Sequence, residues 1–191
     1  MPNTGRPGVS SHLRGAEETA TGVSTTAVTV LGVVAVLAVA LDQLVKELST
    51  DGLTENEPVR ILGGLVYLCL WRNSGAAWSV GSGHTWVFPL VAIVVTGWIG
   101  WVAVRLRSKP WAVALGLVLG GTLGNLGDRL FRDPGVLRGH VVDMISLFGP
   151  DARYFPVFNV ADMCLTAGVV LAVVLELTGR SRDGSRTQST R

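Results

Sequence analysis

The chain has 191 residues, of which 48% are apolar and 16% are charged, against about 25% charged residues in an average soluble domain. Its net charge of +2 excludes the strongly basic surface of a nucleic-acid-binding protein, and its length indicates one domain. The two cysteines, Cys69 and Cys164, form no C-x-x-C pair, which argues against a disulfide framework or a zinc site. The mean hydropathy of +0.44 comes from long apolar runs, and these indicate a membrane protein.

Four apolar runs predict four membrane-spanning helices between polar tails. Each run approaches the roughly 20 residues that cross about 30 Å of hydrocarbon at 1.5 Å per residue. The predicted spans are residues 24–45, 85–104, 111–130 and 159–177. Residues 1–23 and 179–191 are polar and unpatterned, so we expect two disordered tails. A cleaved signal peptide ending near Ala38-Val39-Ala40 is the competing interpretation of the first run, but the tail before it is long and weakly basic.

Positive charge near the spans predicts how the chain is oriented, because cytoplasmic loops carry an excess of lysine and arginine. The short link between the second and third spans carries Arg105, Arg107 and Lys109, and the C-terminal tail carries four arginines. Both termini and this link are therefore expected in the cytoplasm. The longer loops, residues 47–84 and 131–158, are then expected on the outer side.

The first outer loop has the pattern of a β-hairpin. Residues 59–62 and 65–71 are rich in β-branched and aromatic side chains, with Gly63-Gly64 between them. We expect a small sheet on the membrane surface, with Trp71, Trp78 and Trp86 at the interface, where tryptophan is enriched. The predicted fold class is a mainly α membrane protein with four transmembrane helices and a small extracytoplasmic sheet.

Ionisable residues in or beside membrane spans are costly, so they are candidates for function. Asp42 and Lys46 lie four residues apart on one helix face, at the outer end of the first span. They form either a structural ion pair or a pair that supports an adjacent site. Asn73, in the segment WRNSGAAWS, either belongs to an ordinary turn or directs its amide into a substrate groove.

The third span combines a stripe of glycines with a polar cluster. The glycines recur every four residues, at Gly116, Gly120 and Gly124. This spacing lets another helix pack closely. Asn125, Asp128 and Arg129 follow on one face near the outer end of the span, where Arg129 is either an anchor to lipid headgroups or part of a site.

Two aspartates are expected at the outer membrane face. Asp143 stands in the apolar segment GHVVDMISLF, and Asp162 follows 19 residues later, where the fourth span begins. Two carboxyl groups that share a site do not both ionise easily, so one keeps its proton while the other acts as a base. Such a pair can activate water against an amide without a metal or a covalent intermediate. From these residues alone, an ion- or proton-conducting pair and a helix-capping role for Asp162 remain open.

The position of Asn159, three residues before Asp162, gives the two carboxyl groups different predicted charges. If Asn159 caps the fourth span, Asp162 lies in the first helical turn, where the helix dipole favours the charged form. We therefore predict that, without a ligand, Asp162 is more often ionised and Asp143 more often protonated. The two groups are expected to titrate as a pair.

Five segments in order resemble the lipoprotein signal peptidase family, also called signal peptidase II. They are DQLVK (42–46), NSGAAW (73–78), GNLGDR (124–129), HVVDMI (140–145) and FNVADMCL (158–165). The resemblance covers residues 27–178, and the layout of four spans also matches. The departures are the long polar tails and Met144, where the family commonly has a bulky aromatic residue.

The resemblance implies an intramembrane aspartyl peptidase with Asp143 and Asp162 as its catalytic dyad. The polar residues around the dyad would be Asp42, Lys46, Asn73, Asn125, Arg129 and Asn159. The implied substrate is a prolipoprotein with a diacylglyceryl-modified cysteine, cut just before that cysteine near the extracytoplasmic face of the bacterial inner membrane. The family has a surface β-cradle and needs no cofactor. We expect a monomer in contact with membrane lipids, with no metal and no nucleic-acid partner.

Other functions fit the sequence less well. It contains no G-x-S-x-G motif of a serine peptidase, and His12, His84 and His140 form no H-E-x-x-H zinc motif. The alternative that is not a peptidase is a small proton- or ion-coupled transporter subunit, which would need polar groups through the membrane depth. Residues 87–102 of the second span contain no ionisable side chain, which argues against that alternative.

Overall fold

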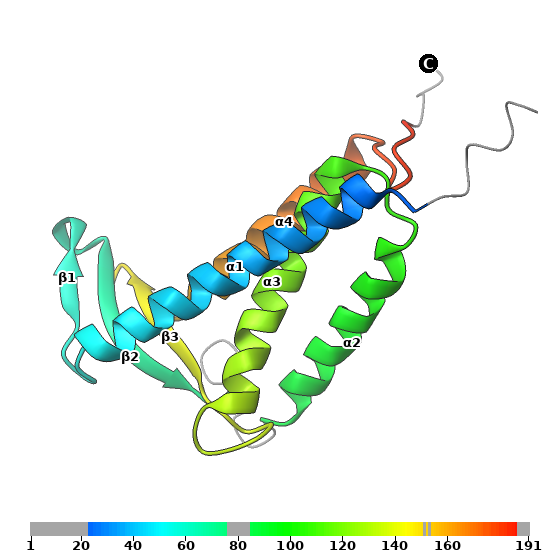
Figure 1. The fold of residues 1–191 in the computed structure, drawn as a ribbon. Coiled ribbons are helices and arrows are strands. Elements are labelled where there is room, and N and C mark those ends of the chain that lie inside the picture. Colours follow the sequence, from blue (N-terminus) through cyan, green and yellow to red (C-terminus); the bar gives the residue numbers. More distant parts are fainter. Residues whose placement is uncertain (1–22, 76–84, 151, 153, 187–191) are drawn as a thin grey trace, which may run out of the picture.

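The computed structural model describes residues 23–75, 85–150, 152 and 154–186, and its elements form a helical bundle with a small sheet at one end (Figure 1). The helices are α1 (Thr25–Gly52), α2 (Val87–Ala103), α3 (Lys109–Phe131) and α4 (Val160–Leu177), with a 3-10 turn η1 (Leu62–Gly64). The strands are β1 (Val59–Ile61), β2 (Val66–Asn73) and β3 (Val141–Leu147).

The helices have the length and composition of membrane spans. Within the described residues, α1, α3 and α4 are long and apolar enough to cross a bilayer, and α2 is a shorter apolar helix of 17 residues. Large aliphatic side chains such as Val36, Leu37 and Val94 are more than 60% exposed on the outside of the bundle. Lipid tails are the natural neighbours of such side chains, whereas water is not.

Helix α1 is longer than the first predicted span. Its 28 residues extend about 42 Å at 1.5 Å per residue, and it ends at Gly52 rather than near Val45. Residues 47–52, expected in the outer loop, are therefore helical. The end of the helix is stabilised by the sheet, because Val45 and Leu53 pack against an apolar cluster centred on Val142 and Met144.

Glycines bring α3 close to α1 and α4, as their spacing predicted. A Cβ atom added to Gly120 would lie 2.5 Å from the Cβ of Ala38 and 2.8 Å from the carbonyl oxygen of Ala35, both in α1. A Cβ added to Gly168 of α4 would lie 2.7 Å from the carbonyl oxygen of Ala114 in α3. Because the backbones approach so closely, short polar side chains on these helices can reach one another.

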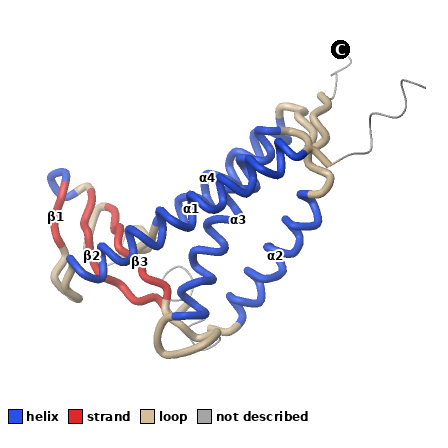
Figure 2. The backbone as a smooth tube through the Cα atoms, in the orientation of Figure 1, coloured by secondary structure: helices blue, strands red, loops and turns tan. Residues whose placement is uncertain are grey.

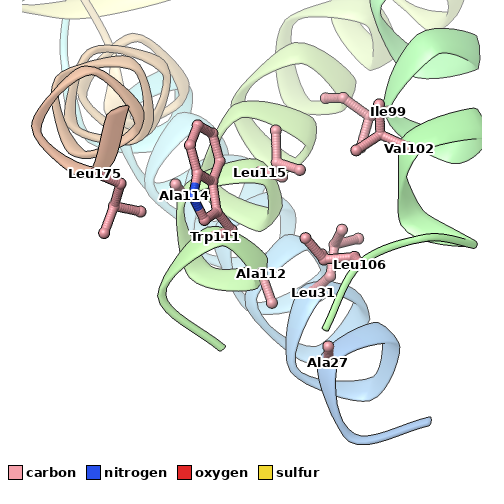
Figure 3. Packing of buried hydrophobic residues seen from close by; sticks show 10 residues of the cluster. All are labelled: Ala27, Leu31, Ile99, Val102, Leu106, Trp111, Ala112, Ala114, Leu115 and Leu175. Carbon is pink, nitrogen blue, oxygen red and sulfur yellow. The ribbon is translucent and has the colours of Figure 1, made fainter. Parts of the chain in front are cut away.

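The main apolar cluster lies at the end of the bundle away from the sheet (Figures 1 and 3). Trp111 and Leu115 come from α3, Leu31 from α1, Ile99 from α2 and Leu175 from α4. The indole N–H of the buried Trp111 donates to the carbonyl oxygen of Arg180 at 2.7 Å. Apolar packing thus holds the helices together at one end, and the polar side chains gather toward the other.

The predicted hairpin is confirmed, and a third strand extends it. β2 lies in the middle of the sheet and pairs antiparallel with both β1 and β3 (Figure 2). β3 lies in the second of the two loops that were expected on the outer side, where no strand was predicted. A shift of register between Leu68 and Trp71 interrupts the β2–β3 pairing beside Asp143, and such irregularities bend a strand locally. The predicted fold class, mainly helical membrane protein with a small sheet, is confirmed.

The first part of the C-terminal tail is ordered, which differs from the expected disorder. The backbone N–H groups of Arg107 and Ser108 both donate to the carbonyl oxygen of Arg182, at 2.9 and 3.1 Å. Residues 180–186 therefore fold back onto the link between α2 and α3. The expectations for residues 1–22 and 187–191, and for Trp78, fall outside the described residues.

Candidate active site

Asp143 is buried on β3 and its carboxyl group is held from two sides. It stands opposite Trp71 on the neighbouring strand β2. Asn73, two residues further along β2 and so on the same face, donates from Nδ2 to Asp143 Oδ2 at 3.0 Å. Asn159 donates from Nδ2 to Asp143 Oδ1 at 2.6 Å. Because both oxygens accept an amide N–H, the orientation of the carboxyl group is defined by the sheet and by the start of α4.

Asp162 lies in the first turn of α4, where Asn159 caps the helix as predicted. The Asn159 side chain accepts a hydrogen bond from the Asp162 backbone N–H at 2.9 Å, and Asp162 Oδ2 accepts from the Asn159 backbone N–H at 3.3 Å. This reciprocal pair is a capping box, which satisfies two N–H groups at the helix start. The same asparagine therefore contacts both aspartates.

Asn125 of α3 links the two aspartates to α1. Its Nδ2 donates to Asp162 Oδ1 at 2.8 Å, and its Oδ1 accepts from Lys46 Nζ and from Asn159 Nδ2, both at 3.0 Å. A continuous set of hydrogen bonds thus runs from Lys46 through two asparagines to both carboxyl groups. Amide side chains suit this role because each can donate and accept at once.

A buried charge cluster supports the site from the α1 side. Lys46 Nζ lies 2.7 Å from Asp42 Oδ2 and 2.7 Å from Asp128 Oδ2, and all three side chains are fully buried. Asp42 also accepts the backbone N–H of Ala161 in α4 at 2.8 Å, and Asp128 accepts that of Val142 in β3 at 3.2 Å. The pair predicted between Asp42 and Lys46 is therefore a buried ion pair that also touches the elements carrying both aspartates.

Arg129 of α3 fastens the end of β2 and the segment before β3. Its guanidinium donates to the carbonyl oxygens of Asn73 at 3.1 Å, Gly139 at 3.0 Å and Gly75 at 2.6 Å. The guanidinium carbon also lies 5.4 Å from the ring centroid of Phe88 at the start of α2. The buried Arg129 therefore clamps these two segments together and also lines the site. Because its guanidinium is buried, Arg129 is not an anchor to lipid headgroups, which was one of the two interpretations from the sequence.

Both aspartates line a cavity of about 1010 Å³ between α2, α3, α4 and the segment after β3. Most of its wall is aliphatic or aromatic, including side chains such as Phe88, Val95 and Val170, and the polar groups gather near the aspartates. An apolar cavity with a few convergent polar groups is the usual form of a site for a largely apolar ligand.

Burial and neighbouring charge give Asp143 an unusual proton affinity. Burial in the sheet, followed by the negative charge of Asp162, raises the pKa of Asp143 to about 7, although the hydrogen bonds from Asn73 and Asn159 oppose this rise. A carboxyl group with this pKa keeps its proton near neutral pH and can donate a hydrogen bond. This direction supports the predicted assignment of the proton to Asp143.

The structure brings the eight residues singled out from the sequence into one region. They are Asp42, Lys46, Asn73, Asn125, Arg129, Asp143, Asn159 and Asp162. Asp128 was named from the sequence, but its ion pair with Lys46 was not predicted. Gln43, which donates to the Gly124 carbonyl oxygen at 3.1 Å, was missed. The available signal was that each is a polar residue directly beside a candidate in a membrane span, Gln43 beside Asp42 and Asp128 beside Arg129. Among the described residues, no group of three His, Cys, Asp or Glu side chains is arranged to hold a metal ion.

The chain is similar to known proteins over most of its length. The family model described as signal peptidase (SPase) II matches residues 34–178. A lipoprotein signal peptidase from Leifsonia xyli is 43% identical over 166 residues, which cover 87% of this chain and 75% of that protein. The corresponding protein from Rhodococcus jostii is 47% identical over 156 residues, covering 82% and 76%.

Solved structures agree with this relationship. A bacterial membrane enzyme solved by the in meso method at 2.3 Å resolution superposes with a TM-score of 0.67 and 29% identity, covering 83% of this chain and 92% of that one. A second, solved at 1.9 Å resolution, has a TM-score of 0.66 at the same identity and covers 84% and 98%. Residues 34–178, which the family model matches, include both aspartates and the described polar residues that contact them. The chain therefore belongs to the signal peptidase II family of aspartic peptidases.

Proposed function

We propose that Asp143 and Asp162 form the catalytic dyad with which this enzyme removes signal peptides from prolipoproteins. The observation that carries the proposal is that Asn159 contacts both carboxyl groups while both line one apolar cavity. Membership of the signal peptidase II family supports the peptidase activity. The alternative function, a transporter subunit, receives no support from any of these similarities.

The proposed reaction divides the work between the two aspartates. Asp162, charged at the start of α4, takes a proton from a water molecule, and Asp143 donates a hydrogen bond to the scissile carbonyl oxygen. The water oxygen then bonds to the carbonyl carbon and forms a tetrahedral intermediate. Its collapse breaks the C–N bond as the amine nitrogen receives the proton held by Asp162. The three asparagines keep both carboxyl groups in place through these steps, so little reorganisation is needed.

The apolar cavity supports the finer proposal that the substrate carries a diacylglyceryl group on the cysteine after the cleaved bond. Two acyl chains need an extended apolar surface, and the largely apolar cavity wall between α2 and α4 offers one. The aspartates lie where this wall meets the polar end of the bundle. A lipidated cysteine held by its acyl chains would place the preceding peptide bond beside the dyad.

The distribution of charge supports a further proposal, that both termini face the cytoplasm and the active site lies near the outer face. Arg105, Arg107 and Lys109 lie at the bundle end opposite the sheet, together with the segment that carries Arg180, Arg182 and Arg186 (Figure 1). Labelling of single cysteines placed in each tail, from either side of sealed vesicles, would test the orientation.

The decisive experiment is cleavage of a purified diacylglyceryl-modified prolipoprotein by the wild-type enzyme and by Asp143→Asn and Asp162→Asn. Each variant keeps an amide oxygen that can accept a hydrogen bond, so the fold is expected to survive, and thermal unfolding would check this. We expect each variant to lose at least a thousandfold in kcat/KM. The matched control is Asp51→Asn, an exposed aspartate at the end of α1, which should cleave at the wild-type rate. Full activity in either folded dyad variant would exclude the proposed mechanism.

A further inference from the structure

A cluster of basic side chains covers the bundle end that lies farthest from the proposed active site. It is formed by the α2–α3 link, the start of α3 and the folded-back C-terminal segment (Figure 1). Its members are Arg105, Arg107, Lys109, Arg180, Arg182 and Arg186. All are exposed except Arg180, which is half-buried. Among acidic residues, Asp183 lies on the same segments and Glu176 lies at the end of α4.

This basic cluster carries more positive charge than its protein neighbours neutralise. Within the described part of the chain, no salt bridge within 4.0 Å involves Arg105, Lys109, Arg180, Arg182 or Arg186. The start of α3 adds to the charge, because its first turn contains no acidic residue and no side chain caps it. Basic residues at the positive end of a helix dipole repel it, and a bound anion relieves that repulsion.

Tryptophan rings hold two of the guanidinium groups in defined positions. The guanidinium carbon of Arg105 lies 4.4 Å from the ring centroid of Trp101, and that of Arg182 lies 5.1 Å from Trp111 and 5.9 Å from Trp98. A guanidinium stacked on a ring keeps its N–H edge available for an oxygen pair. The exposed rings of Trp98 and Trp101 are of the type found at the level of lipid headgroups.

The backbone of the C-terminal segment also fixes Arg182 to the link. Its carbonyl oxygen accepts the N–H groups of Arg107 and Ser108, and the carbonyl oxygen of Arg180 accepts the indole N–H of Trp111. The cluster therefore combines segments about 75 residues apart in the sequence. Holding the C-terminal segment against the link costs conformational entropy, which a freely solvated tail would not lose.

We propose that this basic cluster binds the phosphate headgroups of anionic phospholipids in the adjacent membrane leaflet. Paired guanidinium groups match the two free oxygens of a phosphate diester, and the tryptophans place them at headgroup depth. Anionic lipid thus supplies the counter-charge that the protein lacks here. The cluster serves as a lipid-binding anchor at the bundle end away from the dyad.

The test is native mass spectrometry of the full chain in detergent with an equimolar mixture of phosphatidylglycerol and phosphatidylcholine. The informative variant is Arg105→Gln with Arg182→Gln. Its charge-matched control is Arg60→Gln with Arg138→Gln, two exposed arginines near the sheet. Arg105→Gln with Lys109→Gln is a second variant that leaves the stacking of Arg182 intact. Peptidase activity verifies that each protein is folded, because none of these residues belongs to the proposed site.

The wild type should retain phosphatidylglycerol in preference to phosphatidylcholine. Each arginine lost should reduce that retention about fivefold, which is the effect of about 1 kcal/mol per basic residue near an anionic surface. The proposal is overturned if both variants at the cluster retain as much phosphatidylglycerol as the control. Equal retention of phosphatidylglycerol and phosphatidylcholine by the wild type would also overturn it, because the cluster would then not select an anionic lipid.

Discussion

Replacing Lys46 with methionine tests whether the buried charge cluster supports the site. Methionine keeps most of the aliphatic length but removes the ammonium group that lies 2.7 Å from both Asp42 and Asp128. Asp128 keeps Arg132, whose Nε lies 2.7 Å away, whereas Asp42 has no other cation within 4.0 Å among the described residues. Leaving a buried charge unpaired costs about 3–5 kcal/mol, so we expect Lys46→Met to lower the free energy of unfolding by that amount.

The effect should also reach the dyad. Lys46 donates to Asn125, which in turn donates to Asp162, so the Asp162 carboxyl group loses part of its support. Since a displacement of about 1 Å in an active site can cost a hundredfold in rate, kcat of the folded variant should fall ten- to hundredfold. Unfolding in detergent and cleavage of a lipidated prolipoprotein measure the two effects separately.

The chain offers a matched control and a rescue. Lys109→Met is the same substitution at an exposed position and should change the free energy of unfolding by less than about 0.5 kcal/mol. Adding Asp42→Asn to Lys46→Met removes the unpaired charge but keeps an oxygen for the Ala161 N–H, so the double variant should be more stable than Lys46→Met alone. The reasoning is refuted if Lys46→Met is as stable as Lys109→Met, or if Asp42→Asn destabilises it further.

Three other predictions follow from the packing, the pKa of Asp143 and the Arg129 clamp. Gly120→Ala should lower the free energy of unfolding by about 1–3 kcal/mol, because its Cβ would meet α1, whereas Gly32→Ala meets nothing within 4 Å and should not lower it. Because the pKa of Asp143 is raised to about 7, its proton is lost above that pH, so kcat/KM should fall tenfold per pH unit there; a constant kcat/KM up to pH 9 would contradict this. Arg129→Lys should reduce kcat/KM at least tenfold, because an ammonium does not reproduce the planar donors to three carbonyl oxygens, and Arg138→Lys should not. Equal activity of these two lysine variants would show that the clamp is dispensable.

Much of this protein could be predicted from its sequence because the signals are local. Long apolar runs specify membrane helices, since every backbone polar group in lipid must be satisfied within the segment. The four-residue repeat of glycine predicted a close helix contact, and an asparagine three residues before Asp162 predicted a helix cap. The motifs were also sufficient to indicate the family, which the similarity to known lipoprotein signal peptidases then showed.

Other features were decided only by the tertiary structure, because they depend on contacts between distant segments. The strand character of β3 depends on its pairing with β2, 68 residues or more earlier in the chain. The ion pair of Lys46 with Asp42 could be predicted from their spacing, but the second partner of Lys46, Asp128, is 82 residues away in the sequence. The folding back of residues 180–186 likewise requires the α2–α3 link, whose backbone N–H groups donate to the carbonyl oxygen of Arg182. The sequence by itself thus determined the candidate site residues, since polar groups in an apolar run stand out. Only the packed helices and sheet bury Asp143 and bring the charge of Asp162 near it, which raises the pKa of Asp143.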